Sequence, residues 1–257
     1  MTGLIWLEPD TPLPEPHLAL PEGLLAAGGD LSVPRLVEAY SKGIFPWFNE
    51  GDPVLWWSPN PRMVLACRDF RASRSLAKKL RQIERDQGTP NERVVITVNA
   101  AFDEVMRACA GPRATQTGTW ISPWIMRAYR EWHELGQVHS IETWMEGRLA
   151  GGLYGVSLGG FFFGESMFTQ RPDASKIALA YLVRFLARHG VTHIDCQQDT
   201  RHLASLGAAP MSRPAFMQLL KPALQRPSPP WQVGRLLADG GLCALARPRV
   251  SLGETEA

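Results

Sequence analysis

Three polar side chains in apolar surroundings are the first candidates for chemistry. Glu165 falls inside the apolar run FFFGESMF, and Asp195 and Gln197 end a second run, VTHIDCQ. Buried acids are costly unless they are paired, so these residues could equally form structural ion pairs or hydrogen bonds. However, polar groups at adjacent strand ends, beside glycines that admit a close backbone, are typical of functional sites.

A further candidate nucleophile is Ser157, which stands in a G-x-S-x-G pattern. In serine hydrolases this pattern needs a strand, a tight turn and then a helix. Here Gly160 and three phenylalanines follow, and they predict another strand. We therefore interpret the match as coincidental and expect Ser157 on a hairpin strand. The six histidines and four dispersed cysteines show no metal-ligand spacing, so we expect no metal site.

Two of the nine tryptophans, Trp47 and Trp120, stand in loops beside glycine and proline, outside any regular apolar period. Tryptophan most often fills a core. A tryptophan in a loop can also stack on a nucleobase, which contributes about 1–3 kcal/mol per base. The residue pattern alone leaves both uses open.

Five basic residues recur at intervals of three and four, which would place them on one helical face. They are Arg71, Arg74, Lys78, Arg81 and Arg85. Such a face is commonly no more than a solvated surface. Only Glu84 is near enough in sequence to form an ion pair with this row of cations. An unpaired row of this kind also fits the phosphate backbone of a nucleic acid.

Hydrophobic periodicity and turn residues predict the elements that position these groups. Helices are expected over residues 33–41, 73–85, 123–135, 174–189 and 201–206, and another is expected around 102–109, with Asn99 and Asp173 as helix caps. Strands are expected over residues 93–98, 138–145, 148–158, 161–168 and 191–196. A meander of antiparallel strands followed by a helix and a strand is an α+β layout. Its order matches acetyltransferase-like folds.

The composition is that of a globular protein, with 45% hydrophobic and 20% charged residues. The 23 glycines and 21 prolines together stay below the roughly 25–30% that marks low-complexity chains. A net charge of +2 indicates no particular partner. The N-terminus shows no signal-peptide pattern, and no apolar run reaches the ~18 residues of a membrane span. We expect a cytoplasmic protein without membrane association.

Nine sequence blocks, in order between about residues 23 and 216, resemble the leucyl/phenylalanyl-tRNA–protein transferases. They are GLLAAGGDLS, AYSKGIFPWF, LWWSPNPR, GTWIS, HELGQVHSIE, GGLYGVSLG, FFGESMF, DASK and IDCQ…HLASLGA. The resemblance implies a small N-terminal domain (1–60) and an acetyltransferase-like catalytic domain (61–222), followed by a C-terminal tail (223–257). It also implies transfer of leucine or phenylalanine, and of methionine less well, from aminoacyl-tRNA to proteins that begin with Arg or Lys. This transfer marks those proteins for N-degron proteolysis.

The resemblance also implies roles for individual residues. The catalytic residues would be Asp195, Gln197 and Glu165. Trp47 and Trp120 would form the walls around the terminal adenosine. The pocket for the acyl side chain would be formed by Leu153, Leu182, Leu186 and Ile194. The five basic residues would bind the tRNA. The chain departs from the family at Leu153, where methionine is frequent, and at Gln170, where arginine is frequent. The first departure would retune the acyl pocket, and the second would change a polar contact.

The implied reaction needs little chemical activation by the protein. An aminoacyl ester is already activated, and an α-amino group with a pKa of about 7.7–8.0 is partly neutral near pH 7. We therefore expect no cofactor and no metal, and a monomer that positions the amine and stabilises the oxyanion. Gln197 would orient the amine, Asp195 would polarise it and accept charge, and Glu165 would attract the cationic acceptor residue.

Two other functions fit parts of the sequence. A CoA-dependent N-acetyltransferase would share the fold, but residues 171–176 lack the glycine that its pyrophosphate loop needs. A non-catalytic RNA-binding adaptor would explain the basic face, but it would leave Glu165, Asp195 and Gln197 without a role.

Overall fold

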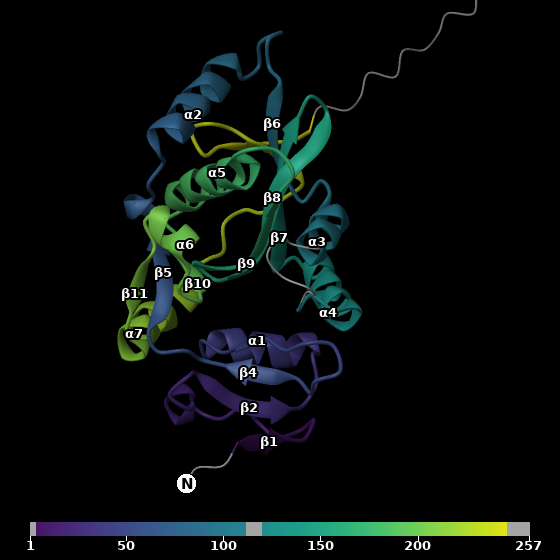
Figure 1. Cartoon of the computed structure of the whole chain (residues 1–257), viewed down its shortest axis with the longest axis vertical. Coiled ribbons are helices and arrows are strands. Elements are labelled where there is room, and N and C mark those ends of the chain that lie inside the picture. The colour runs from purple at the N-terminus through teal and green to yellow at the C-terminus, as the bar shows by residue number, and fades with distance from the viewer. Residues whose placement is uncertain (1–3, 112–119, 246–257) are drawn as a thin grey trace, which may run out of the picture.

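The protein contains a small and a large β-sheet (Figure 1). The structure is a computed structural model that describes residues 4–111 and 120–245. The small sheet is formed by β1 (Ile5–Leu7), β2 (Leu24–Gly28), β4 (Leu55–Trp57) and β3 (Phe45–Pro46), in that order. Helix α1 (Val33–Ser41) covers the side of this sheet that faces the rest of the molecule, as predicted for residues 33–41.

The large sheet has nine strands in the order β11-β5-β10-β9-β8-β7-β6-β12-β13. Their bounds are β5 Arg62–Ala66, β6 Val94–Val98, β7 Val138–Met145, β8 Arg148–Leu158, β9 Phe161–Thr169, β10 His193–Gln197, β11 Ala209–Met211, β12 Gly234–Leu236 and β13 Leu242–Cys243. All neighbouring pairs are antiparallel except β9 and β10. The predicted α+β class is confirmed, with the order of elements expected of an acetyltransferase-like fold.

The parallel pair β9–β10 is short, and this matters for the site. Phe162 pairs with Ile194 and Phe163 with Asp195, and no pairing between the two strands follows. Beyond these residues β9 pairs only with β8, and β10 pairs only with β5. Glu165 and Gln197 both lie just past the point where β9 and β10 separate.

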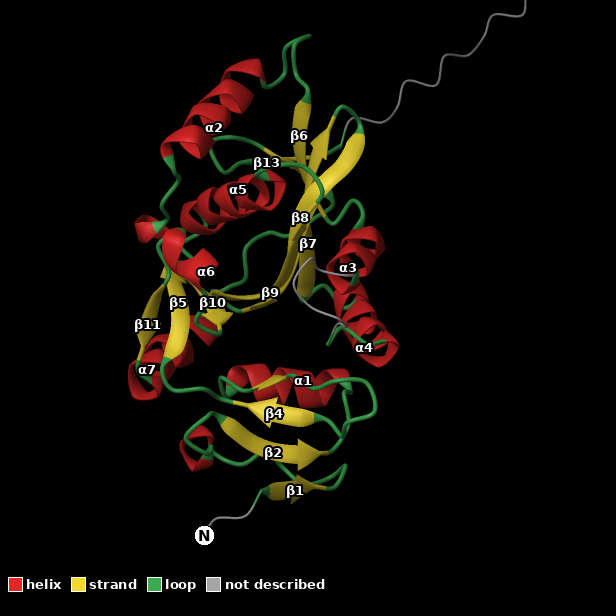
Figure 2. Cartoon of the chain, in the orientation of Figure 1, coloured by secondary structure: helices red, strands yellow, loops and turns green. Residues whose placement is uncertain are grey.

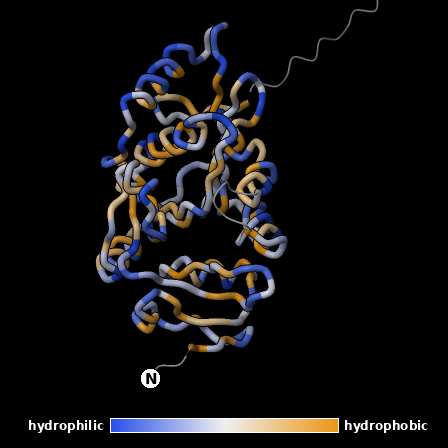
Figure 3. The backbone as a smooth tube through the Cα atoms, in the orientation of Figure 1, coloured by the Kyte–Doolittle hydropathy of each residue, from blue (hydrophilic) through white to orange (hydrophobic). Residues whose placement is uncertain are grey.

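Helices cover both faces of the large sheet (Figure 2). Helix α5 (Ala174–Arg188) packs on one face, and α3 (Phe102–Ala110) and α4 (Pro123–Glu134) pack on the other. Helix α2 (Arg74–Asp86) lies outside α5, and Figure 3 shows it as mainly hydrophilic. The short α6 (Arg201–Ser205) and α7 (Arg213–Leu224) follow β10 and β11. A separate hydrophobic core forms on each face of the sheet.

Two predicted helix caps are wrong in detail. Helix α3 begins only at Phe102, and Asn99, with φ of 56°, instead accepts a hydrogen bond from the Ser140 amide at 3.0 Å. Asp173 does occupy the N-cap position of α5, but its carboxylate caps no backbone N–H. It pairs with Lys79 at 2.5 Å and Lys176 at 3.3 Å, because a left-handed backbone turns the side chain away from the helix.

The segment expected as a C-terminal tail extends the large sheet. The boundary expected at residue 222 falls inside α7, and β12 pairs with β6 while β13 pairs with β12. Residues 246–257 of that segment lie outside the described residues. Within the described ranges, no helix combines the length and apolar character that a bilayer crossing requires.

Candidate active site

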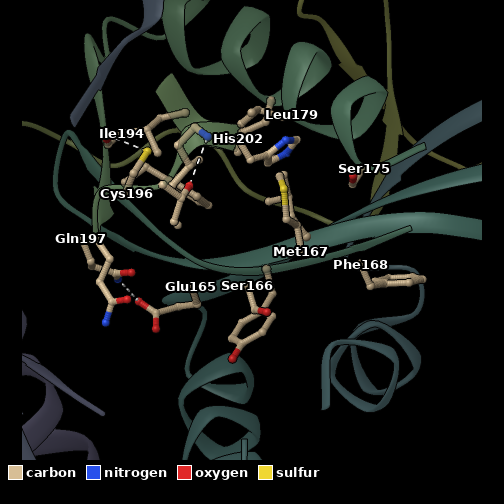
Figure 4. Close-up of a pocket in the computed structure, with 18 of the residues that line it drawn as sticks. Glu165, Ser166, Met167, Phe168, Ser175, Leu179, Ile194, Cys196, Gln197 and His202 are labelled. Carbon is tan, nitrogen blue, oxygen red and sulfur yellow. Dashed lines mark hydrogen bonds between the residues drawn. The ribbon is translucent and has the colours of Figure 1, made fainter. Parts of the chain in front are cut away.

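A cavity of about 760 Å³ opens where β9 and β10 separate. Its walls come from both strands, from α5 and from the loop around β3. Figure 4 shows Glu165 and Gln197 together at one edge, with Met167 and Leu179 deeper in the cavity. The interior is mainly apolar, so the cavity suits a ligand with a hydrophobic end and a polar end.

Glu165 is the centre of a hydrogen-bond cluster at the polar edge. Tyr40 donates to its Oε1 at 2.8 Å, Tyr129 donates to its Oε2 at 3.3 Å, and the Gln197 amide group donates to Oε1 at 3.0 Å. The two tyrosine hydroxyls are 2.5 Å apart. Removal from water raises the pKa of Glu165 to about 7, and the negative charge of Asp195 adds to the rise, while the three hydrogen bonds oppose it.

Sequence reasoning missed Tyr40 and Tyr129. Both lie on helix faces that the apolar period assigns to the core, and both are fully buried. The available signal was chemical, because a buried tyrosine hydroxyl usually needs a hydrogen-bond partner. That rule shows the need for a partner but does not identify Glu165.

Asp195 is fully buried and forms an ion pair with Arg62, which is also buried. The guanidinium donates from Nε to Oδ1 at 2.8 Å and from Nη2 to Oδ2 at 2.6 Å. Asp195 does not line the cavity. This corrects the expectation that it faces the reacting amine, since both of its oxygens are held by Arg62.

The same carboxylate fixes the backbone of Gln197. Asp195 Oδ1 accepts a hydrogen bond from the backbone N–H of Gln197 at 2.9 Å. Gln197 has a positive φ of 56°. The register between β10 and β5 shifts at this point. Bulges of this kind often re-aim a side chain next to a functional site. Asp195 is therefore placed to position Gln197, whose side chain does line the cavity.

Arg62 was also missed. It stands in the block LWWSPNPR, where spacing gives no hint of a partner 133 residues away. In the structure its third group, Nη1, donates to the Gly43 carbonyl at 3.1 Å. The guanidinium also lies 4.7 Å from the ring centre of Phe45 and 4.9 Å from that of Phe216. Arg62 thus connects β10 to the segment that follows α1.

Comparison with known proteins identifies the family of the chain. Residues 64–221 match the family model described as leucyl/phenylalanyl-tRNA protein transferase, and residues 29–60 match the model of that family's N-terminal domain. The chain belongs to this family. A relative named leucyl/phenylalanyl-tRNA–protein transferase from Bordetella petrii is 60% identical over 241 residues, covering 93% of this chain and 95% of the relative. One of the same name from Bordetella avium is 58% identical over 246 residues, covering 95% and 98%.

Two solved structures that resemble the chain share much less of its sequence. A GCN5-related N-acetyltransferase from Kribbella flavida has 14% identity and a TM-score of 0.36, covering 68% of this chain and 60% of that chain. A functionally unknown conserved protein from Staphylococcus epidermidis has 10% identity and a TM-score of 0.38, covering 74% and 68%. The fold is defined by the sheet order described above.

Seven of the nine residues that the family resemblance assigned to catalysis or to the bound aminoacyl group line the cavity. Its lining includes Glu165 and Gln197, the two tryptophans Trp47 and Trp120, and the apolar Leu153, Leu182 and Ile194. Leu186 does not line it, which corrects that expectation. One turn beyond Leu182 on α5, Leu186 is fully buried in the core on that face of the sheet. Gln170 is exposed outside the cavity lining.

The basic face of α2 is exposed to solvent. Arg74, Lys78, Arg81 and Arg85 lie on it, whereas Arg71 precedes the helix cap Ser73, which corrects the expectation of five residues on one helical face. In the described part of the chain none of these five forms an ion pair with a carboxylate. The neighbouring Lys79 does, with Asp173.

Ser157 lies on β8 as predicted, and it is buried. Its hydroxyl accepts a hydrogen bond from Trp231 Nε1 at 2.9 Å, and no histidine among the described residues contacts it as a base would. The structure therefore gives Ser157 no features of a hydrolase nucleophile.

The buried ion pair predicts the effect of breaking it. Replacing Arg62 with Met leaves Asp195 buried and charged without a partner, so the free energy of unfolding should fall by about 3–5 kcal/mol in urea denaturation. The double variant Arg62→Met/Asp195→Leu should recover most of this loss. A matched control is Arg35→Met, because Arg35 pairs with the half-buried Glu38 and should cost less. A loss below 1 kcal/mol for Arg62→Met would contradict the assignment.

Proposed function

We propose that this protein transfers a leucyl or phenylalanyl group from aminoacyl-tRNA to the α-amino group of proteins that begin with Arg or Lys. The observation that carries the proposal is an apolar cavity whose polar edge holds Gln197 and Glu165. Family membership supports the reaction class. The cavity geometry supports the assignment of its parts.

The apolar interior suits the acyl side chain. Leu153, Leu182 and Ile194 line it, and burial of each additional methylene contributes about 0.8 kcal/mol. Trp47 and Trp120 lie on the same cavity, where they can stack on the terminal adenosine. Trp47 is 38% exposed and packs edge-on against Trp57 at 5.6 Å, so one part of the ring is fixed while another stays open to a ligand.

The polar edge suits the amine. In the proposed reaction the nitrogen of the neutral α-amine forms a bond to the ester carbonyl carbon. The bond from this carbon to the 3′-oxygen of the adenosine then breaks. The nitrogen loses one proton and the leaving 3′-oxygen gains one. Gln197 orients the amine through its carboxamide, which is too weak a base to keep a proton. Glu165 attracts the positive charge of the acceptor residue. Asp195 acts through Gln197, as a positioning residue.

The remaining parts of the chain complete the proposal. The basic face of α2 binds the tRNA by charge complementarity. Residues 1–60 form an N-terminal domain, and the segment expected as a tail belongs with the catalytic domain, because β12 and β13 extend its sheet. The protein acts as a monomer in this proposal. The tRNA substrate supports a cytoplasmic location.

The direct test is incubation with radiolabelled leucyl-tRNA and a protein that begins with Arg. We expect strong labelling of this protein and much weaker labelling of the same protein beginning with Ala. Gln197→Ala should slow single-turnover transfer by about 10²-fold, because the amine loses its orientation. Gln225→Ala, an exposed glutamine at the end of α7, is the control and should keep the wild-type rate. Equal rates for both variants would contradict the role of Gln197.

The pKa of Glu165, about 7, predicts pH-dependent selectivity. Above pH 7 the carboxylate is charged and favours an Arg-initiated peptide over an Ala-initiated one, and below pH 7 protonation removes this advantage. The ratio of the two kcat/KM values should fall about tenfold from pH 8 to pH 6. The ratio cancels titration of the α-amine, which both peptides carry. In Glu165→Gln the ratio should be low and flat, and a wild-type ratio without pH dependence would count against the role.

The basic face predicts how salt affects tRNA binding. Replacing Arg74, Lys78 and Arg81 with Gln should weaken binding and reduce the slope of log affinity against log salt by about 3. The control replaces three exposed arginines elsewhere, Arg148, Arg188 and Arg226, and should leave the slope unchanged. Titrations at four salt concentrations would measure both slopes, and identical slopes would exclude α2 as the tRNA contact.

A further inference from the structure

The chain between α7 and β12 inserts one large side chain into the core of the catalytic domain. Trp231 packs against the same hydrophobic core that contains Leu153, Leu182 and Ile194 of the cavity wall. The family match ends at residue 221, so Trp231 lies ten residues beyond it.

Trp231 is held in one orientation by contacts to three strands and a helix. Its Nε1 donates to Ser157 on β8 at 2.9 Å, and its ring stacks on His139 of β7 at 4.1 Å with an interplanar angle of 10°. On other sides it lies 4.7 Å from the ring of Phe185 on α5 and 5.8 Å from that of Phe162 on β9, measured between ring centres. A side chain fixed on so many sides has few alternative rotamers.

Phe162 connects Trp231 to the cavity. It is fully buried and is one of the residues that line the cavity. Gly155 packs directly against its ring, because a Cβ built on Gly155 would lie 2.6 Å from the ring carbons of Phe162. The ring is thus confined by the backbone of β8 and contacted by Trp231. If Trp231 were smaller, space would open next to Phe162.

We propose that Trp231 is a positioning residue that sets the size of the acyl pocket through Phe162. By this means it influences the choice between leucyl and phenylalanyl groups. The inference rests on the proposed function, because it concerns the acyl specificity of that site. In a close-packed core, the neighbours of a vacated volume relax partly into it. With Trp231 shortened, Phe162 withdraws from the cavity, and the pocket accommodates the larger phenylalanyl group better.

The test compares transfer from phenylalanyl-tRNA and leucyl-tRNA to an Arg-initiated peptide. In Trp231→Ala the ratio of kcat/KM for phenylalanyl over leucyl transfer should rise about tenfold, the lower end of the effect of a methylene-sized change in an apolar pocket. Trp231→Phe keeps a ring in place and should give a smaller rise. The matched control is Trp144→Ala, because Trp144 is also half-buried and donates to a hydroxyl, that of Thr97, but does not line the cavity.

The outcomes separate the inference from the function on which it rests. If the wild type transfers neither group, the proposed function fails and the inference fails with it. If the wild type transfers both and the ratio in Trp231→Ala is unchanged, shifts toward leucine or matches that of Trp144→Ala, only the inference is overturned. A general loss of packing would lower both rates together without moving the ratio. If thermal melting shows that Trp231→Ala is unfolded, Trp231→Phe supplies the same ratio and decides in the same way.

Discussion

The buried pair of Arg62 and Asp195 is the interaction on which the candidate site depends. Two charges removed from water are tolerated only when each satisfies the other and their remaining groups are bonded. Here the pair is bidentate, the last guanidinium group reaches the Gly43 carbonyl, and Asp195 also binds the amide of Gln197. One ion pair therefore fixes the backbone of Gln197 and the end of the N-terminal helix at the same time.

This arrangement explains how two sheets contribute to one cavity. The small sheet supplies the loop with Trp47, and its covering helix supplies Tyr40, which bonds to Glu165 from the large sheet. The large sheet supplies the separation of β9 and β10 that makes the space. Contacts made by Tyr40 and by Arg62 fix the position of the small sheet and α1 relative to the large sheet. The polar edge of the cavity is thus assembled across the molecule, and the apolar interior comes mainly from the large sheet and α5.

Much of this architecture was predictable from the sequence, and the limits were physical. Apolar periodicity with turn residues predicted the meander and α5, because each is decided by neighbours close in the chain. Glu165 and Gln197 could be expected to meet, since each is a polar residue in an apolar strand of the same predicted sheet. The partners Arg62 and Tyr129 could not be predicted, because a buried polar group finds its partner through the tertiary fold and leaves no local spacing. The packing of Trp231 was missed for the same reason.

The backbone at Gln197 also restricts what this position can become. Its left-handed conformation costs most side chains about 1–2 kcal/mol, and β-branched residues are the worst suited. Asparagine and glycine adopt it most readily, but glycine offers no functional group and asparagine is one methylene shorter. The backbone conformation therefore limits which residue types can replace Gln197, whatever chemistry the site needs. Few of the residue types that tolerate this conformation also carry a carboxamide.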